Sequence, residues 1–135
     1  METYDVAFQI FGTEMDPNSI TARIGLSPDK ISAPGATFGI YKGQKRTCDV
    51  GTWSMAGSSE TERIEIQIEK LLTVLRPHKE VLGELKNQGW KMRFFCGVFT
   101  ENATTGISLP CGVLAESGDL GIDIEIAHYF LRSDP

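Results

Sequence analysis

The sequence is short of the residues that build metal sites and disulfide scaffolds. Its 135 residues include two histidines and three cysteines. His78 and His128 are far apart, and neither has a second ligand at metal-binding spacing. The cysteines, Cys48, Cys96 and Cys111, form no paired pattern of the kind found in small secreted proteins. We therefore expect no metal, no cofactor and no disulfide framework.

The sequence also lacks a leader-like start and a long apolar run. Residues 1–5 carry two acids, and no apolar segment approaches membrane-spanning length. The 13 Lys and Arg are outnumbered by 18 Asp and Glu, which gives a net charge of −5. Nucleic-acid binding needs clustered positive charge to neutralise phosphates. We expect a reduced, cytoplasmic protein that binds neither nucleic acid nor membranes.

What the sequence does contain is alternation of apolar and polar residues, the pattern of a half-buried strand. It is found in residues 3–11, 90–99 and 121–126. In the last segment isoleucine alternates with carboxylates, so one face should be buried and the other exposed. The expected buried set is Ile122, Ile124 and Ile126, and the expected exposed set is Asp123 and Glu125.

Helix signals separate these strands. Asp16 suits an N-cap, Pro17 suits the first helical position, and Gly25 suits a left-handed helix end. Residues 59–62 read as a capping box before an apolar helical stripe, which Pro77 divides into two helices. A short helix over residues 108–117, ended by Gly118, precedes the last strand.

Residues 29–57 are rich in glycine and predict a long hairpin, with strands near 37–41 and 47–55. Together the elements predict one domain over residues 1–135, for which 41% hydrophobic residues supply a core. The fold class is α+β. We expect a ferredoxin-like, mainly antiparallel sheet of about five strands with helices on one face.

Several short motifs resemble those of a known family, the bacterial proteins grouped as domain of unknown function 4279. The motifs are Asp16-Pro17, Ile20-Thr21, Gly25-Leu26-Ser27-Pro28 and Gly51-Thr52-Trp53-Ser54, together with the acidic strand near the C-terminus. The resemblance implies a bacterial soluble domain. The family has no agreed activity, so the resemblance transfers no catalytic residue.

Two sets of residues are candidates for catalysis. Cys111 follows Pro110 at an expected helix start, where backbone N–H groups can activate a thiol, and His128 could serve as its base. Asp123 and Glu125 could act as a carboxylate pair. No third group or motif supports either set, and solvent-facing alternation is the better explanation of the two acids.

The sheet face opposite the helices carries more aromatic residues than a wet surface requires. The strand phase that buries Met92, Phe94 and Cys96 turns the intervening residues to this face. The candidate partner-binding residues are Phe11, Lys91, Arg93, Phe95, Phe99, Asp123 and Glu125. A secondary candidate surface is the basic hairpin tip with Lys42, Lys45 and Arg46.

We therefore expect a non-enzymatic cytoplasmic binding protein. Its specific form would be a bacterial immunity protein that neutralises a toxin by protein–protein contact, and the open sheet face could also join two copies as a homodimer. Two alternatives stay open. One is a small enzyme that uses Cys111 or the Asp123/Glu125 pair, and the other is a sensor that binds a small molecule between the hairpin and the sheet.

Overall fold

The computed structural model describes residues 2–41, 44–102 and 104–131, and within 36–47 it describes only the backbone. The strands are β1 (Thr3–Thr13), β2 (Lys30–Ser32), β3 (Ala36–Tyr41), β4 (Gln44–Cys48), β5 (Val50–Ala56), β6 (Lys91–Thr100) and β7 (Asp123–Phe130). The main sheet has the order β2-β5-β1-β6-β7, and β3 and β4 form a separate two-stranded sheet. Every strand pair is antiparallel except β6–β7.

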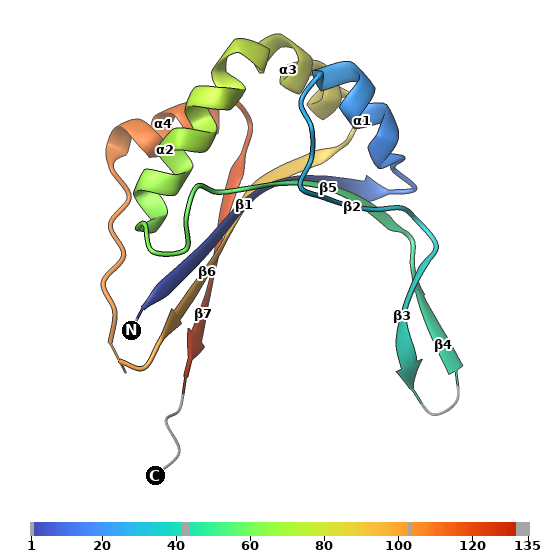
Figure 1. The fold of residues 1–135 in the computed structure, drawn as a ribbon. Coiled ribbons are helices and arrows are strands. Elements are labelled where there is room, and N and C mark those ends of the chain that lie inside the picture. Colours follow the sequence, from blue (N-terminus) through green and yellow to red (C-terminus); the bar gives the residue numbers. More distant parts are fainter. Residues whose placement is uncertain (1, 42–43, 103, 132–135) are drawn as a thin grey trace.

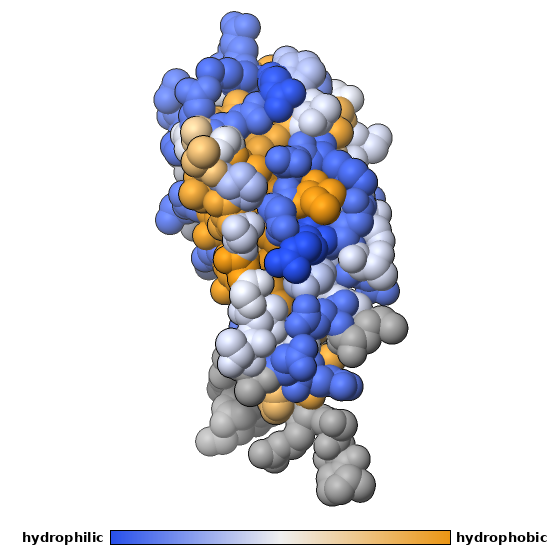
Figure 2. Space-filling model, turned by 90° about the vertical axis from the view of Figure 1, so that its left-hand side faces the viewer, coloured by the Kyte–Doolittle hydropathy of each residue, from blue (hydrophilic) through white to orange (hydrophobic). Residues whose placement is uncertain are grey.

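Helices cover one face of the main sheet, as Figure 1 shows. They are α1 (Pro17–Ile24), α2 (Ile64–Leu75), α3 (Lys79–Asn87) and α4 (Cys111–Asp119), and a short 3-10 helix, Arg76–His78, joins α2 to α3. The β3–β4 hairpin projects from one end of the arched sheet, away from the helices (Figure 1). The side of the molecule on which α2 and α4 lie carries a band of hydrophobic residues (Figure 2).

The core lies between the sheet and the helices. Alternate residues of β1 and β6 point into it, and they are Tyr4, Val6, Phe8, Ile10, Met92, Phe94, Cys96 and Val98. Trp53 of β5 is fully buried, meets the edge of the Phe8 ring, and donates its indole N–H to the Thr21 hydroxyl at 3.0 Å. A buried tryptophan needs such a partner for its polar atom. The half-buried alternation predicted for these strands is therefore confirmed.

The helix signals are confirmed at some ends and wrong at others. The Asp16 carboxylate accepts the Asn18 amide at 3.0 Å, and Gly25 ends α1 with a φ of 78°. The predicted capping box is wrong, because α2 begins at Ile64 and residues 59–62 form a turn before it. The turn after α4 uses Gly121, with a φ of 76°, and not Gly118.

The α+β class and the mainly antiparallel five-stranded sheet agree with the sequence analysis. The ferredoxin-like form is not confirmed, because the strand order differs from that of a four-stranded ferredoxin-like sheet. β7 follows β6 as an additional strand and pairs with it in parallel through the α4 crossover. The predicted strand over 47–55 is divided at Asp49, so that β4 pairs with β3 while β5 joins the main sheet.

The last strand corrects one prediction. Ile122 is buried and Ile124 is half-buried, but Ile126 is 41% exposed. Asp123 and Glu125 are exposed, as predicted. Ile122 packs in the core with Val113 and Leu120 of the α4 segment, and β7 then continues beyond the helix layer (Figure 1). The alternation therefore predicts which face Ile126 occupies but not whether a helix covers it.

Candidate functional site

The strand register places the seven candidate partner-binding residues on the face of the sheet opposite the helices, which we call the open face. Residues directly opposite each other on paired strands share a face. Phe11 lies opposite Lys91, and Thr3 lies opposite Phe99. On the other side of β6, Arg93 lies opposite Asp123 and Phe95 lies opposite Glu125.

Arg93 is the centre of a connected group on this face. Its guanidinium carbon lies 4.5 Å from the centroid of the Phe11 ring and 5.3 Å from that of Phe95. Its Nε donates to the Gln9 side-chain oxygen at 2.7 Å, and its Nη1 forms an ion pair with the Glu125 carboxylate. These five residues, Gln9, Phe11, Arg93, Phe95 and Glu125, are called the Arg93 cluster below.

The Arg93 cluster is partly open to solvent. The Arg93 side chain is 29% exposed and that of Glu125 is 52% exposed. An ion pair of this exposure contributes at most about 1 kcal/mol to stability and is weakened by salt. Each cation–π contact adds a similar amount. Within the described residues, Nη2 of Arg93 makes no hydrogen bond, so its N–H groups remain available as donors.

A second aromatic group extends the open face along β6. The rings of Phe99 and Tyr129 are stacked, with centroids 4.7 Å apart and planes 11° from parallel. The Phe99 ring also covers Gly97, where a Cβ would lie 3.1 Å from it. Tyr129 and Gln9 were not among the predicted site residues. The alternation of β7 could have indicated Tyr129, because it has the same parity as Asp123 and Glu125.

Other candidate residues lie apart from the Arg93 cluster. Lys91 and Asp123 are exposed and form no ion pair among the described residues. Lys42 lies outside the described residues, and Lys45 and Arg46 are described only as part of the β4 backbone. Of the catalytic candidates, Cys111 is exposed at the start of α4, while the carboxylate of Glu125 is already paired with Arg93.

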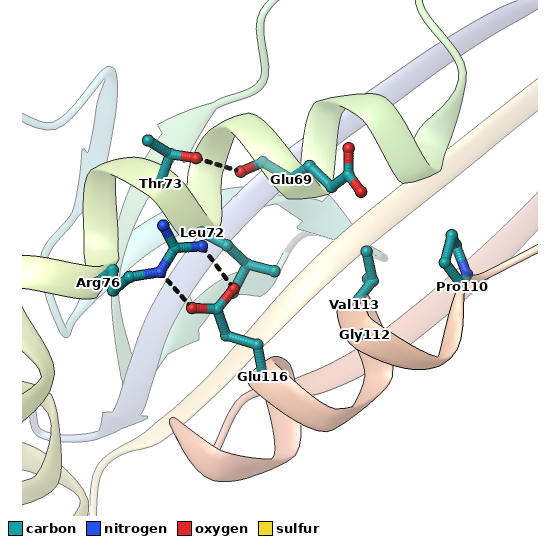
Figure 3. A pocket seen from close by; sticks show the side chains of 8 residues that line it. All are labelled: Glu69, Leu72, Thr73, Arg76, Pro110, Gly112, Val113 and Glu116. Atoms are coloured by element: carbon teal, nitrogen blue, oxygen red, sulfur yellow. Dashed lines mark hydrogen bonds and ion pairs between the residues drawn. The ribbon is translucent and has the colours of Figure 1, made fainter.

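A pocket of about 350 Å³ is lined in part by Phe11 and Lys91. On the helix side, a second of about 350 Å³ lies between α2 and α4 (Figure 3), where Arg76 Nε and Nη2 bind both oxygens of Glu116 at 2.6 and 2.8 Å. The hydrogen bonds from Arg76 lower the pKa of Glu116, and the pair joins the 3-10 helix after α2 to α4. A third pocket, of about 250 Å³, adjoins the Arg93 cluster at Gln9 and is lined mostly by polar side chains of β2 and β5.

Across residues 2–41, 44–102 and 104–131, no three His, Cys, Asp or Glu side chains gather in a way that could hold a metal ion. None of the helices described there has the length and apolar character needed to span a membrane.

Comparison with known proteins identifies a family but no individual relative of known activity. No curated protein and no solved structure matches the chain. The family described as Domain of unknown function (DUF4279) matches residues 1–131, nearly the whole chain. The resemblance of the Gly51-Thr52-Trp53-Ser54 and Asp16-Pro17 motifs is thereby confirmed, and the chain belongs to this family.

Proposed function

We propose that this chain is a non-enzymatic binding protein that contacts a protein partner through its open face. The observation that carries the proposal is the Arg93 cluster. Arginine and large aromatic residues are the usual anchors of protein interfaces, because they combine a wide apolar contact area with directed hydrogen bonds. Here they lie together on a face that none of the described helices covers (Figure 1).

The chemistry of the cluster indicates the kind of partner. The guanidinium of Arg93 offers Nη2 donors to a carbonyl or carboxylate, and the rings of Phe11 and Phe95 offer apolar contact on either side of it. Asp5 and Asp123, exposed on the same face, would lie at the rim and attract basic side chains. We therefore propose a partner surface that is apolar at its centre and basic at its edge.

The specific form that we propose is a cytoplasmic immunity protein whose partner is a toxin. A net charge of −5 suits a partner with a basic surface, since opposite charges accelerate encounter. A protein that blocks a toxin by covering its surface needs a rigid contact face with anchor residues, and it needs no catalytic group of its own.

Affinity capture tests this proposal. Tagged wild-type protein, Arg93→Ala and Ala22→Asp are used to capture proteins from native cell extract, followed by mass spectrometry. Ala22 is exposed on α1, on the helix side of the molecule, and serves as the control. We expect one protein to be retained by the wild type and by Ala22→Asp and lost with Arg93→Ala. A partner retained equally by all three would place the contact surface elsewhere.

A further inference from the structure

The strand β7 forms one edge of the main sheet. In the strand order it follows β6, and it pairs with β6 in an unbroken parallel register from Arg93↔Asp123 to Thr100↔Phe130. Among the described residues no strand pairs with its other side. An edge of this kind presents a row of backbone donors and acceptors that can pair with another chain.

One hydrogen bond fixes which residues turn toward that free side. The amide of Leu131 donates to the carbonyl of Thr100 at 2.7 Å. In a parallel ladder every second residue of a strand bonds to the same neighbour, so Tyr129 and Ala127 also turn their backbone groups to β6. The residues between them turn their N–H and C=O groups outward, and these are Ile124, Ile126, His128 and Phe130.

The edge lacks several of the features that normally prevent pairing. Protected edges carry charged residues, above all lysine, or proline or a bulge, and the charges of β7 are confined to Asp123 and Glu125. Residues 123–130 contain neither Lys nor Pro, and their register with β6 has no shift. Large apolar side chains of β7 are exposed instead, with Ile126 at 41%, Tyr129 at 44% and Phe130 at 55%. Burial of such side chains favours association.

We propose that β7 pairs antiparallel with β7 of a second copy of this chain, about a two-fold axis at Ala127. The two five-stranded sheets then become one continuous sheet of ten strands, twice five. A strand edge is self-complementary under such an axis, as the interface of a symmetric dimer must be. The pairing leaves the open face uncovered, so this inference does not rest on the proposed function.

Charge excludes an axis nearer the start of the strand, and an axis at Ala127 pairs more of β7 than one further along. Two residues that are directly opposite across the axis have their side chains on the same side of the joined sheet. This is possible only if the axis passes through a residue, because an axis between two residues would set side chains of opposite sides against each other. At Ala127 the axis sets Glu125 opposite Tyr129 of the partner subunit and keeps the two Glu125 carboxylates about four residues apart. An axis at Ile126 would bring those carboxylates within about two residues, where like charges repel.

The same register pairs outward-turned residues with each other. Ile126 lies opposite His128 of the partner subunit, and Ile124 lies opposite Phe130 of the partner subunit. Outward residues that face each other across an antiparallel pair exchange both N–H···O=C bonds. The exposed isoleucine and phenylalanine side chains then contact one another on the helix side of the sheet.

Sedimentation equilibrium tests the pairing with two variants at one position. His128→Pro removes an outward N–H without disturbing the bonds to β6, because proline is tolerated where the N–H of an edge strand faces solvent. By symmetry it removes two bonds between subunits, so the dimer dissociation constant should rise at least about tenfold. His128→Ala keeps the amide and should remain dimeric. A monomeric wild type, or dimers of equal strength for both variants, overturns the proposal.

Cross-linking tests the register and does not depend on the proline variant folding. In a background with Cys48→Ser and Cys111→Ser, Ala127→Cys places two thiols at the axis, while Asp123→Cys places them about eight residues apart. Disulfide-linked dimers should form under mild oxidation with Ala127→Cys and not with Asp123→Cys. Equal yields for the two variants, or no cross-link with Ala127→Cys, would refute the pairing at this axis.

Discussion

At the scale of single residues, Glu2 shows how a half-buried acid can join two distant segments. Its carboxylate accepts hydrogen bonds from the Tyr4 hydroxyl at 2.5 Å, Asn102 Nδ2 at 3.1 Å and the Thr105 hydroxyl at 3.2 Å. These bonds, with that from Tyr4 the strongest, hold the pKa of Glu2 at about 2 against an ordinary value of 4.5. The start of the chain is thereby joined to the loop after β6.

This low pKa predicts how the contribution of Glu2 depends on pH. The folded state favours the ionised form, so the stabilisation is complete above the unfolded pKa of 4.5 and is lost as the pH falls toward 2. Urea unfolding of the wild type and of Glu2→Gln should show a less stable variant at neutral pH and a difference that closes across this window. A difference that does not change with pH would show that the charge of Glu2 has no such role.

At the scale of elements, glycine decides how closely β5 approaches the β1–α1 turn. Gly51 lies opposite Gly12 in the β1–β5 register. A Cβ on Gly51 would lie 1.8 Å from the backbone oxygen of Met15, a contact that no side-chain movement could relieve. The glycine of the Gly-x-Trp-Ser motif is therefore required by packing, and it lets Trp53 reach the core two residues later.

A pair of glycine variants tests this. Gly51→Ala should lower the free energy of unfolding by about 3 kcal/mol or more, because the backbones of β5 and the turn must separate. Gly83→Ala, inside α3 with open space around it, should raise that free energy by about 1 kcal/mol, since alanine is the better helix former. Thermal denaturation of both variants is the measurement. A mild effect at Gly51 would mean that the turn adjusts.

Two isoleucines at the start and in the middle of the last strand segment should also respond differently. Ile122→Ala removes a buried side chain and should cost about 2–5 kcal/mol of stability, whereas Ile126→Ala removes an exposed one and should cost less than about 1 kcal/mol. Chemical denaturation at a concentration where the chain is monomeric separates this effect from any association. Equal costs would show that Ile126 is covered in solution.

Local patterns in the sequence predict the strands and helices well, because each pattern acts through residues that are neighbours in the sequence. The period of two in β1 and β6 predicts their buried faces, and Asp16-Pro17 predicts the start of α1. Features that depend on distant segments could not be predicted. The exposure of Ile126 depends on where α4 ends, and the bond between Arg93 and Gln9 depends on the β1–β6 register.

At the scale of the whole molecule, the helices are gathered on one face of the sheet (Figure 1). The strand register places the Arg93 cluster on the other face. The sequence predicts this division and the residues on each side. It does not predict the arrangement of Arg93 between two rings, because that depends on strand register and side-chain rotamers together. The division leaves an uncovered, partly apolar face, on which the account of function depends.

The most direct test of that account is a calorimetric titration of the captured partner with three proteins: wild type, Phe95→Asp and Ala22→Asp. Phe95→Asp should weaken binding by at least about 2 kcal/mol, because it removes one ring beside Arg93 and adds a charge at the centre of the face. Ala22→Asp should bind as the wild type does. Circular dichroism confirms that each variant is folded. Unchanged affinity of folded Phe95→Asp would contradict the claim that the open face is the binding surface.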